Sequence, residues 1–257
     1  MVDAVFFDID GTLLSFETHK IPDSTLDALH SLREKGIKLF IATGRHKLQM
    51  ELIPDLFDFD GYVTLNGQYC FNREGVFRRH SINREDIAVV VEQTKKNRYA
   101  CHFVEEDRMY VNTINETVEA ICRAVDSPLP PVGDPSDALN ADIYQLSVFL
   151  EKGRQNMLLD SLRHVEATWW HPLFFDAIPL GGGKEKGIEA VLGHYGIPRE
   201  RTMAFGDGEN DVTMLEYVQT GIAMGNAGDA AKRAADYVTD DVDSSGIYNA
   251  LKHFGIL

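Results

Sequence analysis

The chain has 257 residues, of which 44% are hydrophobic, and a formal net charge of −15. This length is enough for a sizeable core, in one large domain or two modest ones. The acidic balance argues against nucleic acid and anionic membranes as partners, because a negative surface repels both. No segment approaches the roughly 18 to 20 apolar residues of a membrane span, so we expect no membrane contact.

The first part of the chain alternates apolar runs with amphipathic stretches. Two apolar stripes predict helices, one from Pro22 to about Gly36 and one over 48–56. Proline suits a first helical turn and glycine suits the position just past a helix end. Short apolar runs predict buried strands at 4–7, 37–42 and 62–65. This βαβαβ order favours a parallel sheet with helices on both of its faces.

The same alternation returns near the C-terminus. A helix is predicted over 188–195, ending at Gly196. Buried strands are predicted at 203–205, 221–224 and 237–238. We therefore assign the two ends of the chain to one α/β domain that is split in sequence.

The middle of the chain has a different pattern and contains a Pro-rich connector at 127–135. Amphipathic stripes predict helices at 87–96 and 118–125. Apolar runs predict strands at 101–104, 109–111, 144–150, 168–170 and 174–178. Several of these strands have the pattern of antiparallel neighbours. That pattern favours a smaller α+β domain, inserted after the first half of the α/β domain.

The three cysteines, Cys70, Cys101 and Cys122, are widely spaced and form no CxxC pair. We expect neither a disulfide framework nor a zinc site, and interpret each cysteine as a small buried hydrophobe. The N-terminus has no basic region and only a short apolar run, which is not the pattern of a signal peptide. These features together predict a protein of the reducing cytoplasm.

Two aspartates, Asp8 and Asp10, follow the first predicted strand. Residues i and i+2 of an extended chain point the same way, so both carboxylates are placed to address one site. A cation would relieve their mutual repulsion, and Gly11 permits a sharp turn. Taken alone, the pair fits equally well with two aspartates that merely cap a turn.

Two further segments each carry one candidate residue. Thr43 follows the second strand and offers a hydroxyl and an N–H where a helix would begin, a place that favours anions. On its own it fits an N-cap threonine better. Lys184 begins a helix, where the dipole disfavours a lysine, although a solvated surface lysine is the commoner case.

The segment 205–211 places three acids and an amide within five residues, between glycines. So many oxygen ligands predict a site for a hard cation. An EF-hand calcium loop would need glycine at its sixth position, which is Val212 here, so that alternative fails. We expect all four segments to end strands of one sheet, at the edge where ligands bind. Without a shared site, each of the four segments would need its own structural explanation.

With these segments in this order, the chain resembles the haloacid dehalogenase (HAD) superfamily and, within it, the Cof-type phosphatases. Residues 8–13 resemble the first motif, Thr43 with Gly44 the second, Lys184 the third and residues 206–211 the fourth. The resemblance implies an α/β fold with a Rossmann-like parallel-sheet core domain formed by 1–81 and 182–257. It also implies an inserted α+β cap domain at 82–181.

The resemblance further implies a phosphoric monoester hydrolase that uses Mg²⁺. Asp8 would attack phosphorus and form an aspartyl-phosphate, and Asp10 would act as acid and base. The metal ligands would be the Asp8 carboxylate, the Asp10 main-chain carbonyl and the Asp207 carboxylate. Asp211 would orient Lys184 or metal-bound water. The groups that would hold the phosphate oxygens are the N–H groups of Ile9 and Gly44 and the side chains of Thr43, Lys184 and Asn210.

Three interpretations of Arg45 remain open: it could contact phosphate, contact the cap or pair with an acid. The expected substrate is a small phosphorylated metabolite, with sugar phosphates favoured because similar proteins prefer them. Two alternatives remain: a phosphosugar mutase that uses the same loops, and a non-catalytic phosphosugar-binding regulator. No nucleic-acid partner is expected, because no basic stripe is evident. A cap that covers its own site favours a monomer.

Overall fold

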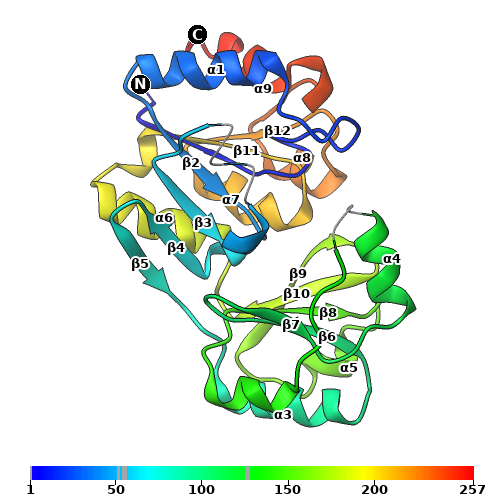
Figure 1. Cartoon of the computed structure of the whole chain (residues 1–257). Helices are drawn as coiled ribbons and strands as arrows, with labels where there is room; N and C mark the ends of the chain where they lie inside the picture. The colour runs from blue at the N-terminus through cyan, green and yellow to red at the C-terminus, as the bar shows by residue number, and fades with distance from the viewer. Residues whose placement is uncertain (1, 51–52, 54–56, 125–127) are drawn as a thin grey trace. The chain divides into compact units, whose positions relative to one another are not determined.

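The computed structural model describes residues 2–257 except 51–52, 54–56 and 125–127. The chain divides into two compact units (Figure 1). Unit 1 contains residues 1–78 and 183–257, and unit 2 contains residues 79–182. Each unit is built around its own sheet.

Unit 1 contains an eight-stranded sheet with the strand order β13-β12-β11-β1-β2-β3-β4-β5. The pairs from β13 to β3 are parallel, whereas β4 runs antiparallel to β3. The predicted parallel sheet is therefore confirmed. The strands are β1 (Ala4–Phe7), β2 (Lys38–Ala42), β3 (Gly61–Thr64), β4 (Tyr69–Asn72), β5 (Gly75–Arg79), β11 (Thr202–Gly206), β12 (Thr220–Ala223) and β13 (Tyr237–Val238).

The centre of this sheet is fully apolar, which explains why its strands read as unbroken hydrophobic runs. Every residue of β1 is buried, as central parallel strands covered on both faces require. Phe6 stacks on Phe40 of β2 at a centroid distance of 5.0 Å, and Phe7 stacks on Phe205 of β11 at 5.3 Å. These contacts tie together the three strands whose ends carry the first, second and fourth candidate segments.

Helices cover both faces of the sheet, as the sequence predicts (Figure 1). On one face, α1 (Asp23–Glu34) packs against α9 (Gly246–His253). On the other face, α6 (Lys184–Tyr195) packs against α7 (Val212–Tyr217), which in turn packs against α8 (Asp229–Ala234). Right-handed crossovers require this division, because the chain moves outward from β1 in opposite directions in its two halves.

The helix and strand predictions for unit 1 hold except in two places. The helix predicted over 48–56 lies largely outside the described residues, and the structure shows a 3₁₀ helix, η1 (Lys47–Gln49), at its start. The strands β4 and β5 were not predicted. β5 is exposed or half-buried and lacks an apolar run, whereas β4 contains apolar residues that were overlooked. Both predicted helix ends are confirmed, since Gly36, two residues after α1, and Gly196, directly after α6, adopt positive φ.

Unit 2 contains a five-stranded antiparallel sheet with the order β7-β6-β8-β10-β9. Its strands are β6 (Ala100–Val104), β7 (Met109–Val111), β8 (Gln145–Phe149), β9 (Val165–His171) and β10 (Phe174–Pro179). α3 (Arg84–Lys95) packs into one apolar cluster and α4 (Glu116–Ala124) into another. The short α5 (Asn156–Leu159) was not predicted. Residues 125 and 127, where a predicted helix ends and the predicted connector begins, lie outside the described residues.

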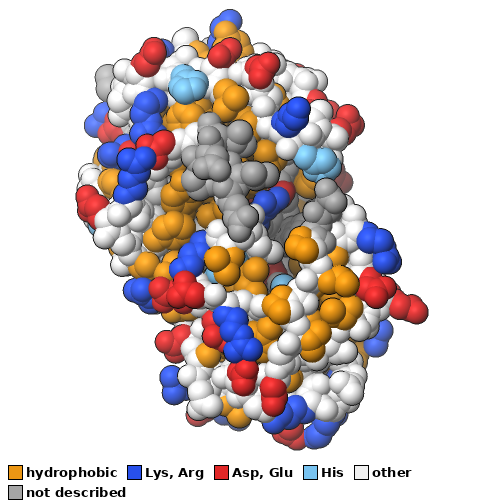
Figure 2. All heavy atoms as spheres, viewed as in Figure 1, with side chains coloured by type: hydrophobic (Ala, Val, Ile, Leu, Met, Phe, Trp, Pro, Cys, Tyr) orange, Lys and Arg blue, Asp and Glu red, His pale blue; other side chains and the backbone are white. Residues whose placement is uncertain are grey.

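Charged side chains of both signs are interspersed on the face drawn in Figure 2, and the residues described there form no continuous basic stripe. Within the described part of the chain, no helix is long and apolar enough to cross a bilayer. Cys70 and Cys101 are buried and Cys122 is half-buried, and all three are free thiols. The interpretation as small buried hydrophobes is therefore confirmed for the first two.

A close backbone approach fixes the start of α6 against the loop after β3. Gly67 has φ +93°, and a Cβ atom built on it would lie 2.1 Å from the carbonyl oxygen of Gly183. Only glycine fits this contact, because any other side chain would push the two backbones apart. Gly183 directly precedes Lys184, so the contact at Gly67 sets where the lysine enters the core.

We predict that Gly67→Ala destabilises unit 1 by about 2 kcal/mol or more, because strain at positive φ adds to the clash with Gly183. Gly36→Ala is a matched control, since Gly36 has φ +75° but nothing lies within 4 Å of the added Cβ. The control should lose only about 1 kcal/mol. Urea unfolding of both variants measures the difference, and equal losses would contradict a role for the close approach.

Candidate active site

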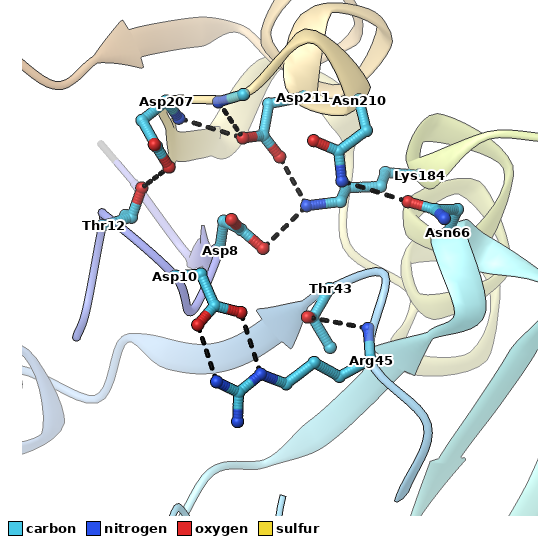
Figure 3. Close-up of polar contacts among 11 residues, drawn as sticks. Asp8, Asp10, Thr12, Thr43, Arg45, Asn66, Lys184, Asp207, Asn210 and Asp211 are labelled. Atoms are coloured by element: carbon cyan, nitrogen blue, oxygen red, sulfur yellow. Dashed lines mark hydrogen bonds and ion pairs between the residues drawn. The ribbon is translucent and has the colours of Figure 1, made fainter. Parts of the chain in front are cut away.

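The candidate residues meet at the carboxyl-terminal edge of the parallel strands in unit 1. Asp8 follows the last residue of β1, Thr43 follows β2 and Asp207 follows β11. Since β1 lies between β11 and β2, the three segments are direct neighbours. Figure 3 shows their side chains converging, with Asp8 in the middle. Ligands of open parallel sheets bind at this edge.

Lys184 reaches the site by a different route from the one predicted. It does not follow a strand of this sheet, because the preceding strand is β10 of the five-stranded sheet. It is instead the first residue of α6. The prediction that all four segments end strands of one sheet is therefore wrong for this segment. Chain order alone cannot show which sheet a preceding strand has joined.

The Lys184 ammonium lies between two carboxylates and is completely buried. Its Nζ donates to Asp8 Oδ1 at 2.8 Å and to Asp211 Oδ1 at 2.5 Å (Figure 3). Burial alone would lower the pKa of Lys184, but the charges of Asp211 and Asp8 outweigh it and raise the pKa. The lysine therefore stays a cation at neutral pH, and it is not a solvated surface residue.

Asp211 uses both of its oxygens inside the protein. Oδ1 accepts from Lys184, and Oδ2 accepts from the N–H groups of Asp207 at 2.9 Å and Gly208 at 2.8 Å. The side chain thus fixes the loop after β11 and the lysine at once. These contacts match the predicted orienting role for Asp211, although they do not test it.

Asp207 is held by a residue far away in sequence. Thr12 Oγ1 donates a hydrogen bond to Asp207 Oδ1 at 3.0 Å. The turn after Asp10 leaves room for this carboxylate, because a Cβ on Gly11 would lie 2.4 Å from Asp207 Oδ2. Gly11 has φ +77°, so both its conformation and its lack of a side chain bring the first and fourth segments together.

The carboxylates in this cluster repel one another in a poorly hydrated place. Burial raises the pKa of Asp8 to about 7, with the charge of Asp211 adding to the effect and Lys184 opposing it. Burial, together with the charges of Asp8 and Asp211, raises the pKa of Asp207 to about 9. One lysine therefore does not balance three aspartates, and a further positive charge would stabilise the cluster.

The donor set fits a hard divalent cation such as Mg²⁺. Oxygen atoms of Asp8, Asp207 and Asp211 all lie within 4.8 Å of one another. Both Asp211 oxygens already accept hydrogen bonds, so Asp211 is the least suited of the three to bind a metal. Among the residues that the structure describes, Asp8 Oδ2, Asp207 Oδ2 and the Asp10 carbonyl accept no hydrogen bond. These are the three predicted ligand groups.

The Asp10 carboxylate does not join the cluster. β1 ends at Phe7 and the chain then turns, so the extended geometry assumed for Asp8 and Asp10 does not persist. The Asp10 side chain instead pairs with Arg45, through Nε to Oδ2 at 2.8 Å and Nη2 to Oδ1 at 2.6 Å (Figure 3). Of the three interpretations of Arg45, pairing with an acid is the one seen here.

Thr43 is not an N-cap, contrary to the interpretation that fits it best on its own. The cap of η1 is His46, whose Nδ1 accepts from Leu48 N–H. Thr43 Oγ1 accepts from the N–H of Arg45 at 3.1 Å, which leaves the hydroxyl proton to be donated elsewhere. Thr43 is buried at the strand end, beside the candidate metal ligands (Figure 3).

The remaining predicted residues take two kinds of position. The Ile9 side chain is buried in the core, so only its backbone is suited to a ligand. Gly44 packs against the Asn66 side chain, whose nearest atoms would lie 3.2 Å from an added Cβ. Asn210 Nδ2 donates to Asn66 Oδ1 at 3.2 Å. Asn66 thus links the second and fourth segments.

Two residues of the site were not predicted to act there. Thr12 lies inside the first motif, directly after Gly11. Its hydroxyl group beside the candidate carboxylates was the signal that could have identified it. Asn66 directly precedes Gly67 near the end of β3, and an Asn-Gly pair predicts a tight turn and not a site residue. Asn66 and Gly67 have φ of +52° and +93°, as such a turn adopts, and Asn66 is buried.

The comparisons with known proteins agree with this geometry. A family model described as haloacid dehalogenase-like hydrolase matches residues 5–251. The chain belongs to this family. The predicted membership of the HAD superfamily and its Cof-type phosphatases is confirmed, as is the α/β fold.

Three similar proteins illustrate the likeness. The solved structure of the subclass IIB sugar phosphatase BT4131 is 41% identical, covers 100% of both chains and has a TM-score of 0.92. BT1666, a phosphatase from Bacteroides thetaiotaomicron, is 38% identical over 100% of this chain and 96% of its own, with a TM-score of 0.92. The 5-amino-6-(5-phospho-D-ribitylamino)uracil phosphatase YitU of Bacillus subtilis (strain 168) is 28% identical over 97% of this chain and 96% of its own. This HAD protein is an enzyme, a phosphatase, as the sequence predicts.

We predict that Mg²⁺ raises the melting temperature more at pH 9 than at pH 5. The raised pKa values of Asp8 and Asp207 mean that the folded chain holds protons that the unfolded chain releases above about pH 4. Stability of the metal-free protein therefore falls as pH rises through about 7 and about 9. A bound cation offsets that loss, by about 2.7 kcal/mol at 100-fold excess over its Kd.

Differential scanning fluorimetry with EDTA or MgCl₂ across this range measures the effect. Asp207→Asn should remove the Mg²⁺-dependent increase, whereas Asp58→Asn, at an exposed carboxylate, should keep it. An increase of equal size at pH 5 and pH 9 would show that these carboxylates do not govern cation binding.

Proposed function

We propose that the chain is a Mg²⁺-dependent phosphatase that hydrolyses a sugar phosphate through an aspartyl-phosphate on Asp8. The observation that carries the proposal is the arrangement around Asp8. Its carboxylate is held at the sheet edge by the buried Lys184, with Asp207 beside it. A fixed carboxylate, a fixed cation and a candidate metal site in one place are what phosphoryl transfer requires.

The first chemical step makes Asp8 the nucleophile. An oxygen of its carboxylate forms a bond to phosphorus while the bond from phosphorus to the ester oxygen breaks. Asp8, Asp207 and the Asp10 carbonyl would hold Mg²⁺, which when bound supplies positive charge against the phosphate and the carboxylates. Lys184 keeps the Asp8 carboxylate oriented and contributes its own charge to the phosphate oxygens.

Other donors surround the place where the phosphate would bind. The Thr43 hydroxyl accepts from Arg45 N–H, so its proton is available to a phosphate oxygen. The N–H groups of Ile9 and Gly44 and the amide of Asn210 complete the proposed cradle. Asn210 reaches this position through its hydrogen bond to Asn66.

Asp10 is the proposed acid and base. It would protonate the leaving alcohol as the ester bond breaks, because a sugar alkoxide is too basic to leave unprotonated. It would then take a proton from the water that attacks the aspartyl-phosphate, which returns Asp8 to its carboxylate form. The side chain takes no part in the acidic cluster and pairs with Arg45 instead, at a place that is about one-third exposed.

The substrate is proposed as a sugar phosphate on the strength of two relatives. BT4131 is a sugar phosphatase, and the substrate named for YitU carries its phosphate on a ribityl group, which is a polyhydroxylated carbon chain. We assign contacts with the leaving group to the predicted cap domain, residues 82–181. We also propose that the protein acts in the cytoplasm as a monomer.

A phosphate-release screen tests the substrate class. Purified protein with Mg²⁺ should release phosphate from hexose and pentose phosphates more efficiently than from nucleoside monophosphates or phosphorylated cofactors. Turnover that requires a sugar bisphosphate activator would favour a mutase. Binding of sugar phosphates with no release from any of them would favour a regulator.

We predict that Asp10→Asn lowers phosphate release by about 10²-fold to 10⁴-fold, the usual contribution of a general acid and base. The variant should keep the Mg²⁺-dependent increase in melting temperature, because its main-chain carbonyl is unchanged. Asp8→Asn is the comparison, and it should lose both turnover and part of the thermal effect. Loss of the Mg²⁺ effect in Asp10→Asn would overturn the separate roles of the Asp10 carbonyl and carboxyl.

A further inference from the structure

Arg45 forms two hydrogen bonds with the side chain of Asp10. None of the roles assigned above accounts for this contact. We propose that Arg45 is a positioning residue that orients the Asp10 carboxyl group for its proton transfers. The inference rests on the proposed function, in which Asp10 is the acid and base.

The Arg45 guanidinium uses three of its five N–H groups in hydrogen bonds within the protein. Nε donates to Asp10 Oδ2 at 2.8 Å and Nη2 donates to Asp10 Oδ1 at 2.6 Å, which forms a planar fork. Nη1 donates to the carbonyl oxygen of Gln49 at 2.9 Å. A phosphate that bound through the Nε and Nη2 fork would have to displace Asp10, which leaves only the second N–H of each Nη for any other contact.

The loop after β2 is built to present this guanidinium. The Gln49 side chain accepts from the N–H of His46 at 2.9 Å, which closes η1 into a capped turn and orients the Gln49 carbonyl. The Arg45 carbonyl accepts from Leu65 N–H at 3.2 Å, and the Arg45 N–H donates to Thr43. Both the backbone and the side chain of Arg45 are thus fixed before any substrate binds.

The two hydrogen bonds fix the carboxyl group of Asp10. Nε and Nη2 reach different oxygens, so both the position of this group and its rotation are held. The pair is also partly solvated, with side-chain exposures of 34% for Arg45 and 31% for Asp10, so the held carboxyl group remains accessible to a substrate and to water.

The consequence for the reaction follows atom by atom. In the first step the Asp10 O–H bond breaks and its proton moves to the ester oxygen, which leaves phosphorus with its electron pair as Asp8 bonds to phosphorus. Asp10 is now a carboxylate, which Arg45 keeps oriented at the site. In the second step Asp10 takes a proton from water, as that water bonds to phosphorus and the bond from Asp8 to phosphorus breaks.

Comparison of two kinds of ester tests the proposal. An aryl ester such as p-nitrophenyl phosphate has a leaving group that needs no proton, whereas an aliphatic ester such as a hexose phosphate does need one. The value of kcat/KM covers steps up to the transfer to Asp8. For Arg45→Ala it should fall about 10-fold or more with the aliphatic ester, and less than about 3-fold with the aryl ester. Inhibition by inorganic phosphate should be unchanged.

Two further variants separate positioning from other roles. Arg45→Lys offers one donor group in place of a fork, so it should recover part of the loss with the aliphatic ester. Arg73→Ala is a matched control, because Arg73 pairs with Asp58 at 2.6 Å near the opposite end of β3 and β4. It should leave both kcat/KM values as they are in the wild type.

A double-variant cycle gives a reading that a structural role would not produce. If Arg45 acts through Asp10, Arg45→Ala should have no further effect on single-turnover cleavage of the aliphatic ester in an Asp10→Asn background. Equal losses for both esters, weaker phosphate inhibition or an additive loss in that background would each overturn the proposal.

The failure of this inference is distinct from the failure of the proposed function. The wild-type protein alone tests whether sugar phosphates are hydrolysed. The Arg45 comparison needs only an aliphatic and an aryl ester, and glycerol phosphate can replace the hexose phosphate. Wild-type activity on both esters with equal losses in Arg45→Ala would overturn the role of Arg45 and leave the phosphatase assignment standing.

Discussion

The buried ammonium of Lys184 is the interaction on which the site depends. Two carboxylates at the ends of different strands, Asp8 and Asp211, face one another inside the protein, and the lysine lies between them. Removing one partner of a buried ion pair leaves an uncompensated charge, which is far more costly than loss of a surface pair. The lysine therefore stabilises the loops after β1 and β11 as well as orienting the proposed nucleophile.

The position of that lysine depends on other parts of the fold. Lys184 arrives on the first turn of α6, and its entry depends on the close contact between Gly67 and Gly183. Positive charge at a helix N-terminus opposes the helix dipole. The carboxylates offset this cost, so the helix start and the acidic cluster are stable only together. The residual negative charge is then what favours a divalent cation.

Much of this could be predicted from the sequence, because burial between two layers of helices leaves an unbroken apolar signature. Strands such as β1 and β11 were placed within a residue or two for that reason. The exposed β5 left no comparable signature. The route of Lys184 could not be predicted either, because it depends on which sheet β10 joins, and chain order carries no record of that.

The contacts within the site were less predictable than the identity of the residues that form it. Asp8, Lys184 and Asp207 were identified by residue type and resemblance. Asp211 was named for Lys184 as one of two possibilities, but the partners of Asp8 and Asp207 were not predicted. The bond from Thr12 to Asp207 joins residues 195 apart in sequence, and the bond from Asn210 to Asn66 joins residues 144 apart. Asp10 was expected to point with Asp8, but that rule holds only within a strand, and β1 ends before either residue.

Burial divides the site into two parts with different duties. Lys184, Asp211 and Asp8 are almost fully enclosed, which suits groups that must keep one geometry throughout a reaction. Asp10 and Arg45 are about one-third exposed, so the carboxyl group of the proposed acid and base stays within reach of a substrate and of water. A fully buried Asp10 would lack that access. The sheet edge therefore combines an enclosed carboxylate, the proposed nucleophile, with a more exposed one, the proposed acid, by placing one below the protein surface and the other at it.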